Sequence, residues 1–451
     1  EPVGGGLAPP AHGLLGDGPA DYGLRYCLAV RALIPVLRGK LEDEGLTALY
    51  EDVELPLAGV LSDVEAAGFA FDAGALEGID SAITARIEEL TAGIHELSGE
   101  KFNINSPKQL AEVLFEKIGL PGGKKTKSGY STNADVLEKL RGAHPVIGLV
   151  LEYRTLTKLK STYIEALPGF AGADGRIRAH LRQTVAATGR LSCTDPNLQN
   201  IPVRQEPGRT LRKAFVPSPG HVLMGADYSQ IELRVLAHFS EDPALIEDFR
   251  SGADIHSRTA ARMFGLAEGA PVSFEQRSAA KAVNFGIIYG MSGFGLSDSL
   301  ATSRKDADRF IKEYFEKHAK VKAWLDAQVA DARALGYTTT LLGRRRAIPE
   351  IRASQFPVRQ LGERLAMNSP VQGSAADVIK VAMNRVHARL LAEGLAARMI
   401  LQVHDELILE VPEGEEAAAA AVLKEEMEEA VTLRVPLVVE IKTGNSWYEL
   451  K

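Results

Sequence analysis

The sequence contains very little cysteine, with only Cys27 and Cys193 among 451 residues. Two cysteines cannot build a disulfide framework, which excludes the small disulfide-stapled secreted scaffolds and favours a reducing cytoplasm. No apolar run reaches the length of about 20 residues that a transmembrane helix needs, and the sequence shows no secretory signal peptide. We therefore expect a cytoplasmic protein without a membrane partner. Because the chain starts at Glu1 rather than Met, we also expect a fragment or a processed product.

The sequence also lacks a net positive charge, because 52 Lys and Arg stand against 59 Asp and Glu, giving a formal charge of −7. This balance at first argues against a nucleic-acid partner, but binding depends on where the charge lies. Residues 158–213 contain ten Lys or Arg and four Asp or Glu. The pattern fits either a basic track for a polyanion or a solvated surface. Its densest basic groups are Arg204, Arg209, Arg212 and Lys213, with Arg344-Arg345-Arg346 as a second cluster.

Length and composition are ordinary for a soluble chain of two to four structural units, and we find no internal repeat. Residues 1–20 are rich in Gly, Pro and Ala, so we expect them to be mobile. The basic, Gly-rich loop at residues 122–129 lacks the spacing of a P-loop, so we reject it as a phosphate cradle.

Apolar periodicity predicts an α+β chain whose antiparallel sheet is assembled from two distant stretches. The spacing of Leu57, Val60, Leu61 and Val64 is typical of a helix, and Asn105-Ser106-Pro107 is a helix-start signal. The predicted segments are one or two helices in 21–52, a mainly helical stretch in 53–163, strands and turns in 164–234, helices in 235–396, and a hairpin, a helix (414–430) and a strand (437–441) in 397–451.

Two aspartates follow or interrupt buried apolar strands almost two hundred residues apart. Asp227 follows Val222-Leu223-Met224, and Asp405 lies between Met399-Ile400-Leu401 and Leu407-Ile408-Leu409. A lone Asp at a strand end is usually a turn residue or a helix N-cap. Two such carboxylates on adjacent strands could instead hold two hard cations for phosphoryl or nucleotidyl transfer.

A third pattern places Arg277, Lys281, Phe285 and Tyr289 four residues apart. On a helix this spacing forms one slowly turning stripe. Two cations followed by two aromatics suit phosphates followed by a sugar and a base. An amphipathic helix with a solvated basic end explains the stripe equally well.

The combined motifs resemble those of family A DNA polymerases, the bacterial DNA polymerase I type. The resemblance runs in order from about Leu55 to the C-terminus. It rests on five runs, which are Thr188–Pro202, Asp227–Arg234, Arg277–Gly290, Asn368–Asp377 and Gln402–Glu406.

The resemblance implies a right-hand polymerase with a thumb, a palm built on an antiparallel sheet, and helical fingers. The implied boundaries are a remnant of a 3′–5′ exonuclease-like domain (1–52), the thumb (53–163), the first part of the palm (164–234), the fingers (235–396) and the second part of the palm (397–451).

The resemblance further implies a monomeric, nucleoid-associated bacterial enzyme that extends a primer on template DNA with deoxynucleoside triphosphates (dNTPs). The implied cofactor is Mg²⁺, two ions, with Mn²⁺ as a substitute. A silent DNA-binding module descended from such a polymerase stays as an alternative, and so does a single-chain RNA polymerase. The motif acids and cations argue against the first, and Glu232 and Phe285 argue against the second.

Site residues carry over from the matched motifs as expectations. Metal binding is implied for Asp227, Tyr228 (through its carbonyl) and Asp405, with Glu406 acting beside them and Lys281 as general acid. The implied dNTP contacts are Gln230, Glu232, His256, Arg277, Lys281, Phe285 and Tyr289. The implied DNA contacts are Lys158, Lys160, Ser161, Arg190, Gln199, Asn200, Arg364, Asn368, Gln372 and His404.

One departure from the family concerns proofreading. Aligning residues 21–36 with the last exonuclease helix places Ala29 where a metal-binding Asp lies in proofreading relatives. We therefore expect no 3′-exonuclease activity.

Overall fold

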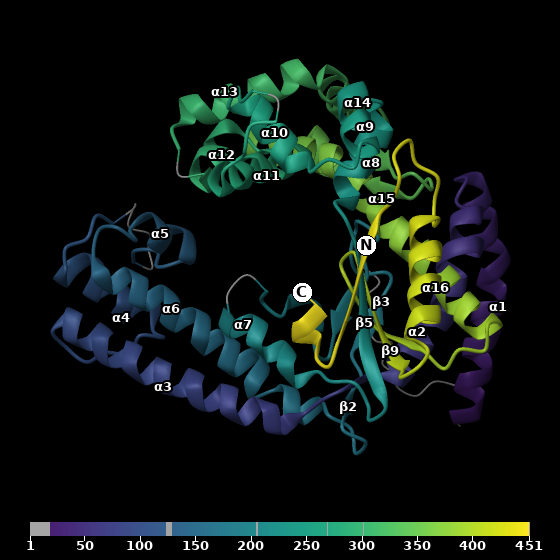
Figure 1. Ribbon diagram of the computed structural model, residues 1–451, viewed down its shortest axis with the longest axis horizontal. Helices are drawn as coiled ribbons and strands as arrows, with labels where there is room; N and C mark the ends of the chain where they lie inside the picture. Colours follow the sequence, from purple (N-terminus) through teal and green to yellow (C-terminus); the bar gives the residue numbers. More distant parts are fainter. Residues whose placement is uncertain (1–18, 123–128, 204–205, 268, 301, 451) are drawn as a thin grey trace.

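The computed structural model describes residues 19–122, 129–203, 206–267, 269–300 and 302–450. Three features expected from the sequence therefore lie outside the described residues: most of the start (1–20), most of the Gly-rich loop (122–129), and Arg204. The described chain is C-shaped, with two helical arms extending from a central β-sheet toward the same side (Figure 1).

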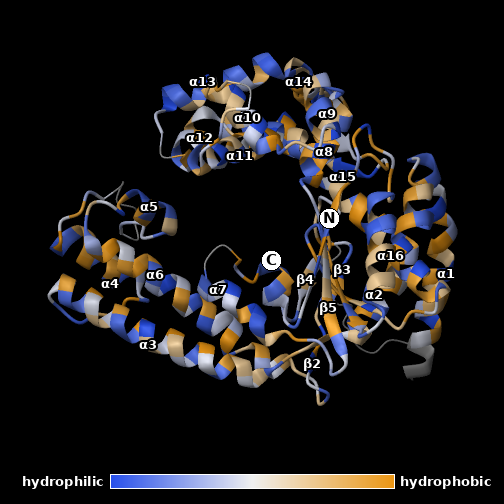
Figure 2. Cartoon of the chain, viewed as in Figure 1, coloured by the Kyte–Doolittle hydropathy of each residue, from blue (hydrophilic) through white to orange (hydrophobic). Residues whose placement is uncertain are grey.

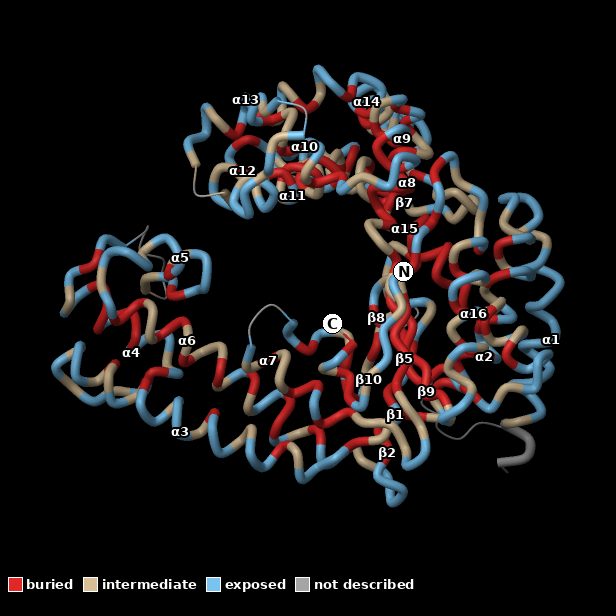
Figure 3. Tube along the Cα trace, viewed as in Figure 1, coloured by how far each residue is buried: buried red, intermediate tan, exposed pale blue. Residues whose placement is uncertain are grey.

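The central sheet has four antiparallel strands in the order β10-β5-β9-β8. These are β5 (His221–Tyr228), β8 (Arg398–Val403), β9 (Glu406–Pro412) and β10 (Val439–Gly444). Several apolar side chains of its two central strands, such as Leu223 and Leu407, are fully buried. The sheet is among the most apolar and most deeply buried parts of the chain (Figures 2 and 3). The predicted hairpin around Asp405 is confirmed as β8 and β9.

The predicted closing strand at 437–441 is placed too early, because β10 begins at Val439 and runs to Gly444. Val439 pairs with Tyr228, the last residue of β5. Earlier residues have no strand to pair with, since β5 has already ended. The predicted helix at 414–430 is confirmed as α16 (Glu416–Glu428).

The first arm is a helical hairpin whose long members, α3 and α6, contact each other. Helix α3 starts at an Asp72 N-cap and ends at Gly99, whose φ of 72° suits glycine. Ser106 caps α4, which confirms the predicted helix start. The arm contains α3 (Ala73–Ser98), α4 (Pro107–Ala111), η2 (Glu112–Lys117), α5 (Ala134–Lys139), α6 (Pro145–Leu159) and η3 (Lys160–Ile164).

The second arm is also helical, and it leads into α15 (Phe356–Ala392), which returns to the sheet. Its helices are α8 (Ile231–Ser240), α9 (Pro243–Arg250), α10 (Ile255–Met263), α11 (Phe274–Ile288), α12 (Gly293–Leu300), α13 (Arg304–Lys317) and α14 (Ala319–Leu335). The sequence did not predict the hairpin of β6 (Tyr337–Thr339) and β7 (Arg345–Ala347), because three-residue strands are too short to show alternation.

The N-terminal segment forms α1 (Pro19–Asp43), η1 (Leu49–Glu54) and α2 (Leu55–Ala67). The predicted helices are present, and several large apolar side chains of α1 are exposed. Leu24, Ile34 and Leu37 are 59%, 47% and 53% exposed. By contrast, α2 contacts β8 and α15. No helix of the described stretches combines the length and apolarity that crossing a membrane requires.

The remaining elements are short and connect the arms to the sheet. Three further two-stranded ladders are β1-β2, β3-β4 and β6-β7. The short elements are β1 (Phe69–Ala70), η4 (Leu167–Phe170), β2 (Arg176–Ile177), β3 (His180–Arg182), β4 (Ser192–Thr194), η5 (Leu198–Asn200), α7 (Glu206–Thr210), η6 (Leu211–Ala214), η7 (Pro349–Arg352) and η8 (Trp447–Leu450).

Candidate active site

The sheet places Asp227 and Asp405 next to each other. Asp227 is the penultimate residue of β5, and Asp405 lies in the turn between β8 and β9. The N–H of Tyr228 donates to the carbonyl of Asp405 at 3.1 Å, which ties this turn to the end of β5. Glu406 pairs with Asp227 across the β5–β9 ladder and is 2% exposed. The two aspartates predicted from the sequence therefore share one end of the sheet.

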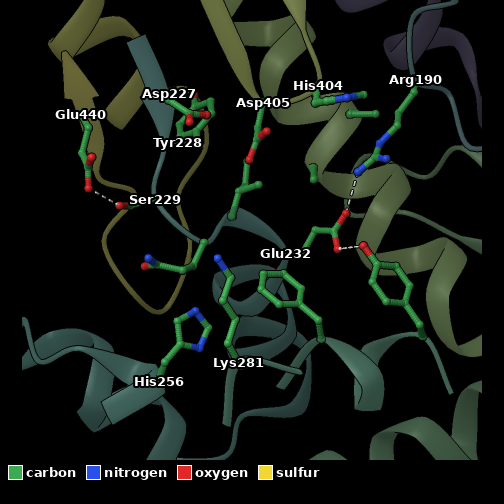
Figure 4. A pocket seen from close by; sticks show the side chains of 16 residues that line it. Arg190, Asp227, Tyr228, Ser229, Glu232, His256, Lys281, His404, Asp405 and Glu440 are labelled. Atoms are coloured by element: carbon green, nitrogen blue, oxygen red, sulfur yellow. Dashed lines mark hydrogen bonds and ion pairs between the residues drawn. The ribbon is translucent and has the colours of Figure 1, made fainter. Parts of the chain in front are cut away.

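Both aspartates open into a cavity of about 620 Å³ between the sheet and the second arm (Figure 4). His404 also comes from the sheet side, and His256, Lys281 and Phe285 come from α10 and α11. Glu406 and Arg277 do not line this cavity. Its lining residues are Arg190, Asp227, Tyr228, Ser229, Gln230, Ile231, Glu232, His256, Lys281, Phe285, Tyr289, Ala375, Ala376, His404, Asp405 and Glu440.

Glu232 links the two sides of this cavity. Its carboxylate accepts hydrogen bonds from Arg190 Nη2 at 2.6 Å and from the Tyr289 hydroxyl at 2.9 Å (Figure 4). Glu232 is only 6% exposed, so this residue is not a solvated surface carboxylate. Burial raises the pKa of Tyr289, and the nearby Glu232 carboxylate raises it further.

The predicted stripe lies on α11, which begins with a capping box formed by Ser273 and Gln276. Tyr289 follows the last residue of the helix. Arg277 forms an ion pair with Asp254, Nε to Oδ2 at 2.6 Å. Burial alone would raise the pKa of Asp254, but hydrogen bonds from Arg277 and Ser257 lower it to about 2. The Arg277 side chain is therefore already engaged by a carboxylate.

His256 is buried, yet its ring lines the cavity. Burial lowers the pKa of His256 to about 4, with Arg277 and Lys281 lowering it further against the opposing effect of Asp254. The imidazole is thus neutral at pH 7. Its Nδ1 lies 3.0 Å from the amide nitrogen of Asn284, a residue that the sequence analysis missed because it lies on the buried face of α11.

The candidate DNA contacts are spread over several elements, including α6 and η3 of the first arm, η5 and α15. Lys158 lies in the last turn of α6, and Lys160 and Ser161 lie in η3. Lys160 Nζ forms an ion pair with Asp80, so the Lys160 charge is already partly compensated within the protein. Gln199 donates to the Gln402 carbonyl at 3.2 Å. Asn200 is at the end of η5, and the group on α15 comprises Arg364, Asn368 and Gln372.

Two basic clusters turn out to be partly internal, which corrects their interpretation as open basic surface. Arg212 is 2% exposed and stacks over the Trp447 ring, with its guanidinium carbon 4.0 Å from the centroid. Arg344 lies between Glu54 and Asp377, with its Nε 2.7 Å from Asp377 Oδ1. Both arginines find partners far away in the chain, which local charge counts cannot reveal.

Two aspartates are a sparse ligand set. Among the residues that the structure describes, no group of three or more His, Cys, Asp or Glu is placed to hold a metal ion. Carboxylate oxygens with an adjacent backbone carbonyl nevertheless fit Mg²⁺, which commonly uses one or two carboxylates and takes its other ligands from water and substrate phosphates. The donors therefore suit a metal bound together with a phosphorylated substrate.

A model of "DNA polymerase family A" matches residues 73–449, so this chain belongs to that family. It is 51% identical over 404 residues to a DNA polymerase I of Caldicellulosiruptor bescii, covering 89% of this chain and 47% of the relative. It is 49% identical over 429 residues to a DNA polymerase I of Bacillus subtilis, covering 95% and 49%. The chain thus spans about half the length of the curated relatives it matches.

The fold is similar to a solved structure of the polymerase domain of Pol1 from M. smegmatis, which is described as a complex with DNA primer-template and dNTP. The TM-score is 0.90 at 43% sequence identity, and the match covers 94% of this chain and 75% of the other. The resemblance drawn from the motifs and the expected α+β fold are confirmed.

Proposed function

We propose that this chain is a template-directed DNA polymerase that adds deoxynucleotides to a primer 3′-hydroxyl and releases pyrophosphate. One observation carries the proposal: a single cavity joins Asp227 and Asp405 to Lys281, His256 and Phe285 on the opposite wall. Acidic groups on one side and cationic and aromatic groups on the other suit a metal-bound triphosphate with its sugar and base.

Asp227 and Asp405, with the Tyr228 carbonyl, would hold two Mg²⁺ ions. Bound there, the ions would lower the pKa of the primer hydroxyl and stabilise charge on the leaving pyrophosphate. Glu406, buried beside Asp227, would keep the carboxylates in place rather than bind metal directly.

The triphosphate would lie along α11 and the start of α10. Lys281 would face it and donate a proton to the departing pyrophosphate. His256 would contribute a hydrogen bond, and Arg277 would exchange the Asp254 carboxylate for a phosphate. Because the side chains of Arg277 and Asp254 are 44% and 37% exposed, this exchange costs little.

Sugar and base selection would fall to the wall opposite the aspartates. Phe285 would pack on the sugar, and Tyr289 would lie under the nascent base pair. Glu232, held between Arg190 and Tyr289, would fill the space of a 2′-hydroxyl. Gln230, at the start of α8, would contact the incoming nucleotide beside it.

The primer-template duplex would lie on the concave side between the two arms. The first arm would act as the thumb, with Lys158 and Ser161 on phosphates, and Lys160 joining them if its pair with Asp80 opens. The second arm would act as the fingers and the central sheet as the palm. Minor-groove contacts would come from Arg190, Gln199, Asn200, Arg364, Asn368, Gln372 and His404, which suit the acceptors shared by all base pairs.

We also propose that this polymerase acts as a monomer, associates with the bacterial nucleoid and does not proofread. Ala29 lies on α1, where a carboxylate would be needed. A labelled primer with a mismatched 3′ end, incubated with Mg²⁺ and no nucleotides, tests the last point. Metal-dependent shortening that persists after Asp405→Ala would overturn it.

The test of the main activity is extension of a labelled primer on a defined template. Template-ordered incorporation of dNTPs in the presence of Mg²⁺, and its loss in EDTA, are the expected results. Duplex binding without extension would instead support the silent DNA-binding module. Faster extension with ribonucleotides would support the RNA polymerase.

A further inference from the structure

A buried polar relay lies behind the cavity, on the far side of His256. Thr259 Oγ1 donates to Asn284 Oδ1 at 3.2 Å, and Asn284 Nδ2 lies 3.0 Å from His256 Nδ1. Thr259, His256 and Asn284 are only 2%, 2% and 1% exposed. Buried polar groups of this kind are high in energy unless satisfied, so the relay holds a defined arrangement.

The arrangement determines which ring nitrogen carries the proton. The charged groups facing the ring are Asp254, which precedes α10, and Arg277 and Lys281 on α11. Burial of the ring is the largest cause of its lowered pKa, and Arg277 and Lys281 lower the pKa further against the effect of Asp254. The imidazole is therefore neutral at pH 7 and has one N–H. The Asn284 amide occupies Nδ1 as a donor, because its oxygen accepts from Thr259. The proton then resides on Nε2.

The ring has one nitrogen directed into the cavity near Lys281 (Figure 4). Since Asn284 occupies Nδ1, the nitrogen that faces the cavity is Nε2. A phosphate oxygen can only accept hydrogen bonds at neutral pH, whereas a neutral imidazole nitrogen can either donate or accept. The tautomer therefore decides whether His256 attracts or repels a phosphate.

We propose that Asn284 is a positioning residue that fixes the Nε2–H tautomer of His256, so that an uncharged imidazole donates a hydrogen bond to the triphosphate. This inference rests on the proposed function for the identity of the ligand, but not for the tautomer. Asn284 is 1% exposed and does not line the cavity, so its effect on nucleotide affinity would be exerted through His256.

The tautomer itself is measured on the free protein. Histidine side chains labelled with ¹⁵N are observed by long-range ¹H–¹⁵N correlation, and the His256 signal among ten histidines is assigned by its loss in His256→Gln. The expected result is a protonated Nε2 and an unprotonated Nδ1 throughout pH 6–9. A protonated Nδ1 in the parent protein overturns the proposal, whether or not the chain polymerises.

The effect on nucleotide binding is measured as the dNTP dependence of single-turnover extension between pH 6 and 9. Asn284→Asp places an acceptor on Nδ1, draws the proton there and leaves a lone pair on Nε2. At pH 8–9 we expect dNTP affinity to fall roughly tenfold or more, the value of a hydrogen bond to a charged group, with a smaller change in maximal rate. In this variant the new carboxylate beside Nδ1 raises the pKa of the His256 ring above its value in the parent. Toward pH 6 the loss of dNTP affinity should therefore shrink, because the ring of the variant becomes an imidazolium that donates from both nitrogens.

Two comparisons separate positioning from a general structural effect. In a His256→Gln background, Asn284→Asp should cause no further loss of dNTP affinity, and an undiminished loss overturns the proposal.

Asn384→Asp is the matched control, because Asn384 is a partly buried helical Asn, on α15, that donates to the Val53 carbonyl at 3.0 Å. Its dNTP affinity should match the parent at every pH. Should Asn284→Asp fail to fold, the parent spectrum and Thr259→Val, which removes the hydroxyl donor to the amide oxygen, still decide the assignment.

If the spectrum gives the expected tautomer but extension fails in the parent, the proposed polymerase function falls while the role of Asn284 stands. If extension succeeds and the tautomer is reversed, only the role of Asn284 falls.

Discussion

The sheet side and the arm side of the cavity are built in different ways. On the sheet side, Asp227 and Asp405 are held by strand register and by the backbone bond from Tyr228. On the arm side, Lys281 and Arg277 are exposed cations on one helix, and Arg277 is oriented by an exposed ion pair. Backbone ladders among buried residues resist displacement, whereas exposed pairs exchange partners readily.

This difference suggests a division of labour. The sheet side would be a fixed platform, ready for metal ions before substrate arrives. The arm side would adapt, exchanging protein partners such as Asp254 and Glu232 for groups of the nucleotide. Preorganised carboxylates lower the reorganisation needed in the transition state, and adaptable cations would allow a nucleotide to enter and pyrophosphate to leave in the proposed reaction.

Removing a ligand from the platform should have the largest effect. Asp405→Ala should reduce single-turnover extension by at least about a thousandfold, because a lost metal ligand costs several kcal/mol of transition-state stabilisation. Duplex affinity, measured by fluorescence anisotropy, should stay close to that of the parent. Extension within tenfold of the parent would show that Asp405 is not a metal ligand.

The buried helices that pack against the platform should also respond more strongly to loss of an ion pair than the arm does, and α15 is one of them because it contacts β8. Lys380 is fully buried, with its Nζ 2.7 Å from Glu54 Oε1, and Arg344 contacts the same carboxylate. Glu54→Gln removes the carboxylate charge beside the buried Lys380 Nζ and leaves Arg344 with Asp377 alone, so we expect thermal unfolding to show a loss of about 3 kcal/mol. Asp254→Asn, at the exposed pair of the arm, should cost less than about 1 kcal/mol. Equal losses of unfolding free energy in Glu54→Gln and Asp254→Asn would contradict the proposed difference between the two regions.

Lowering the pH should destabilise the arm side of the cavity before it destabilises the sheet side. The pKa of His256 is lowered to about 4 by burial, against about 6.5 in an unfolded chain. Below pH 6.5, His256 binds a proton in the unfolded chain but stays unprotonated in the folded chain. The free energy of unfolding therefore falls as pH drops from 6.5 to 4, by up to about 3 kcal/mol. Hydrogen exchange should accelerate in α10 and α11 over this range while β5 and β9 stay protected. His256→Gln should flatten the response, and an unchanged pH profile in that variant would assign the effect to another group.

Local sequence patterns could predict much of this site. The spacing of four residues marks Lys281 and Phe285 on α11 and Tyr289 directly after it, and all three line the cavity. Apolar runs on both sides of Asp405 predict the hairpin that carries it. These features are encoded within a dozen or so neighbouring residues, where hydrophobic periodicity is informative.

The parts that could not be predicted depend on distant pairing. Arg344 is read from the sequence as a surface cation, but its partners, Glu54 and Asp377, are far away in the chain. Arg212 is buried against Trp447 for the same reason. The role of Asn284 depends on the face of α11 that meets α10, and its local sequence carries no signal for that contact. The start of β10 depends on where β5 ends, which only the register reveals.

Glu232 is where the platform and the arm meet, and its substitution should have a smaller but diagnostic effect. It lies on α8, directly after β5, and its carboxylate binds Tyr289 of the arm. If it rejects ribonucleotides by filling the 2′ position, Glu232→Ala should raise ribonucleotide insertion relative to deoxynucleotide insertion about tenfold or more. Glu232→Gln keeps the volume but weakens the bond from Arg190, so it should keep most of the discrimination while changing deoxynucleotide affinity. Single-nucleotide insertion with matched dNTP and ribonucleotide measures both. If Gln and Ala lose discrimination equally, the carboxylate acts by holding Tyr289 and Arg190 in place, and the coupling of platform to arm, rather than a steric clash, selects the sugar.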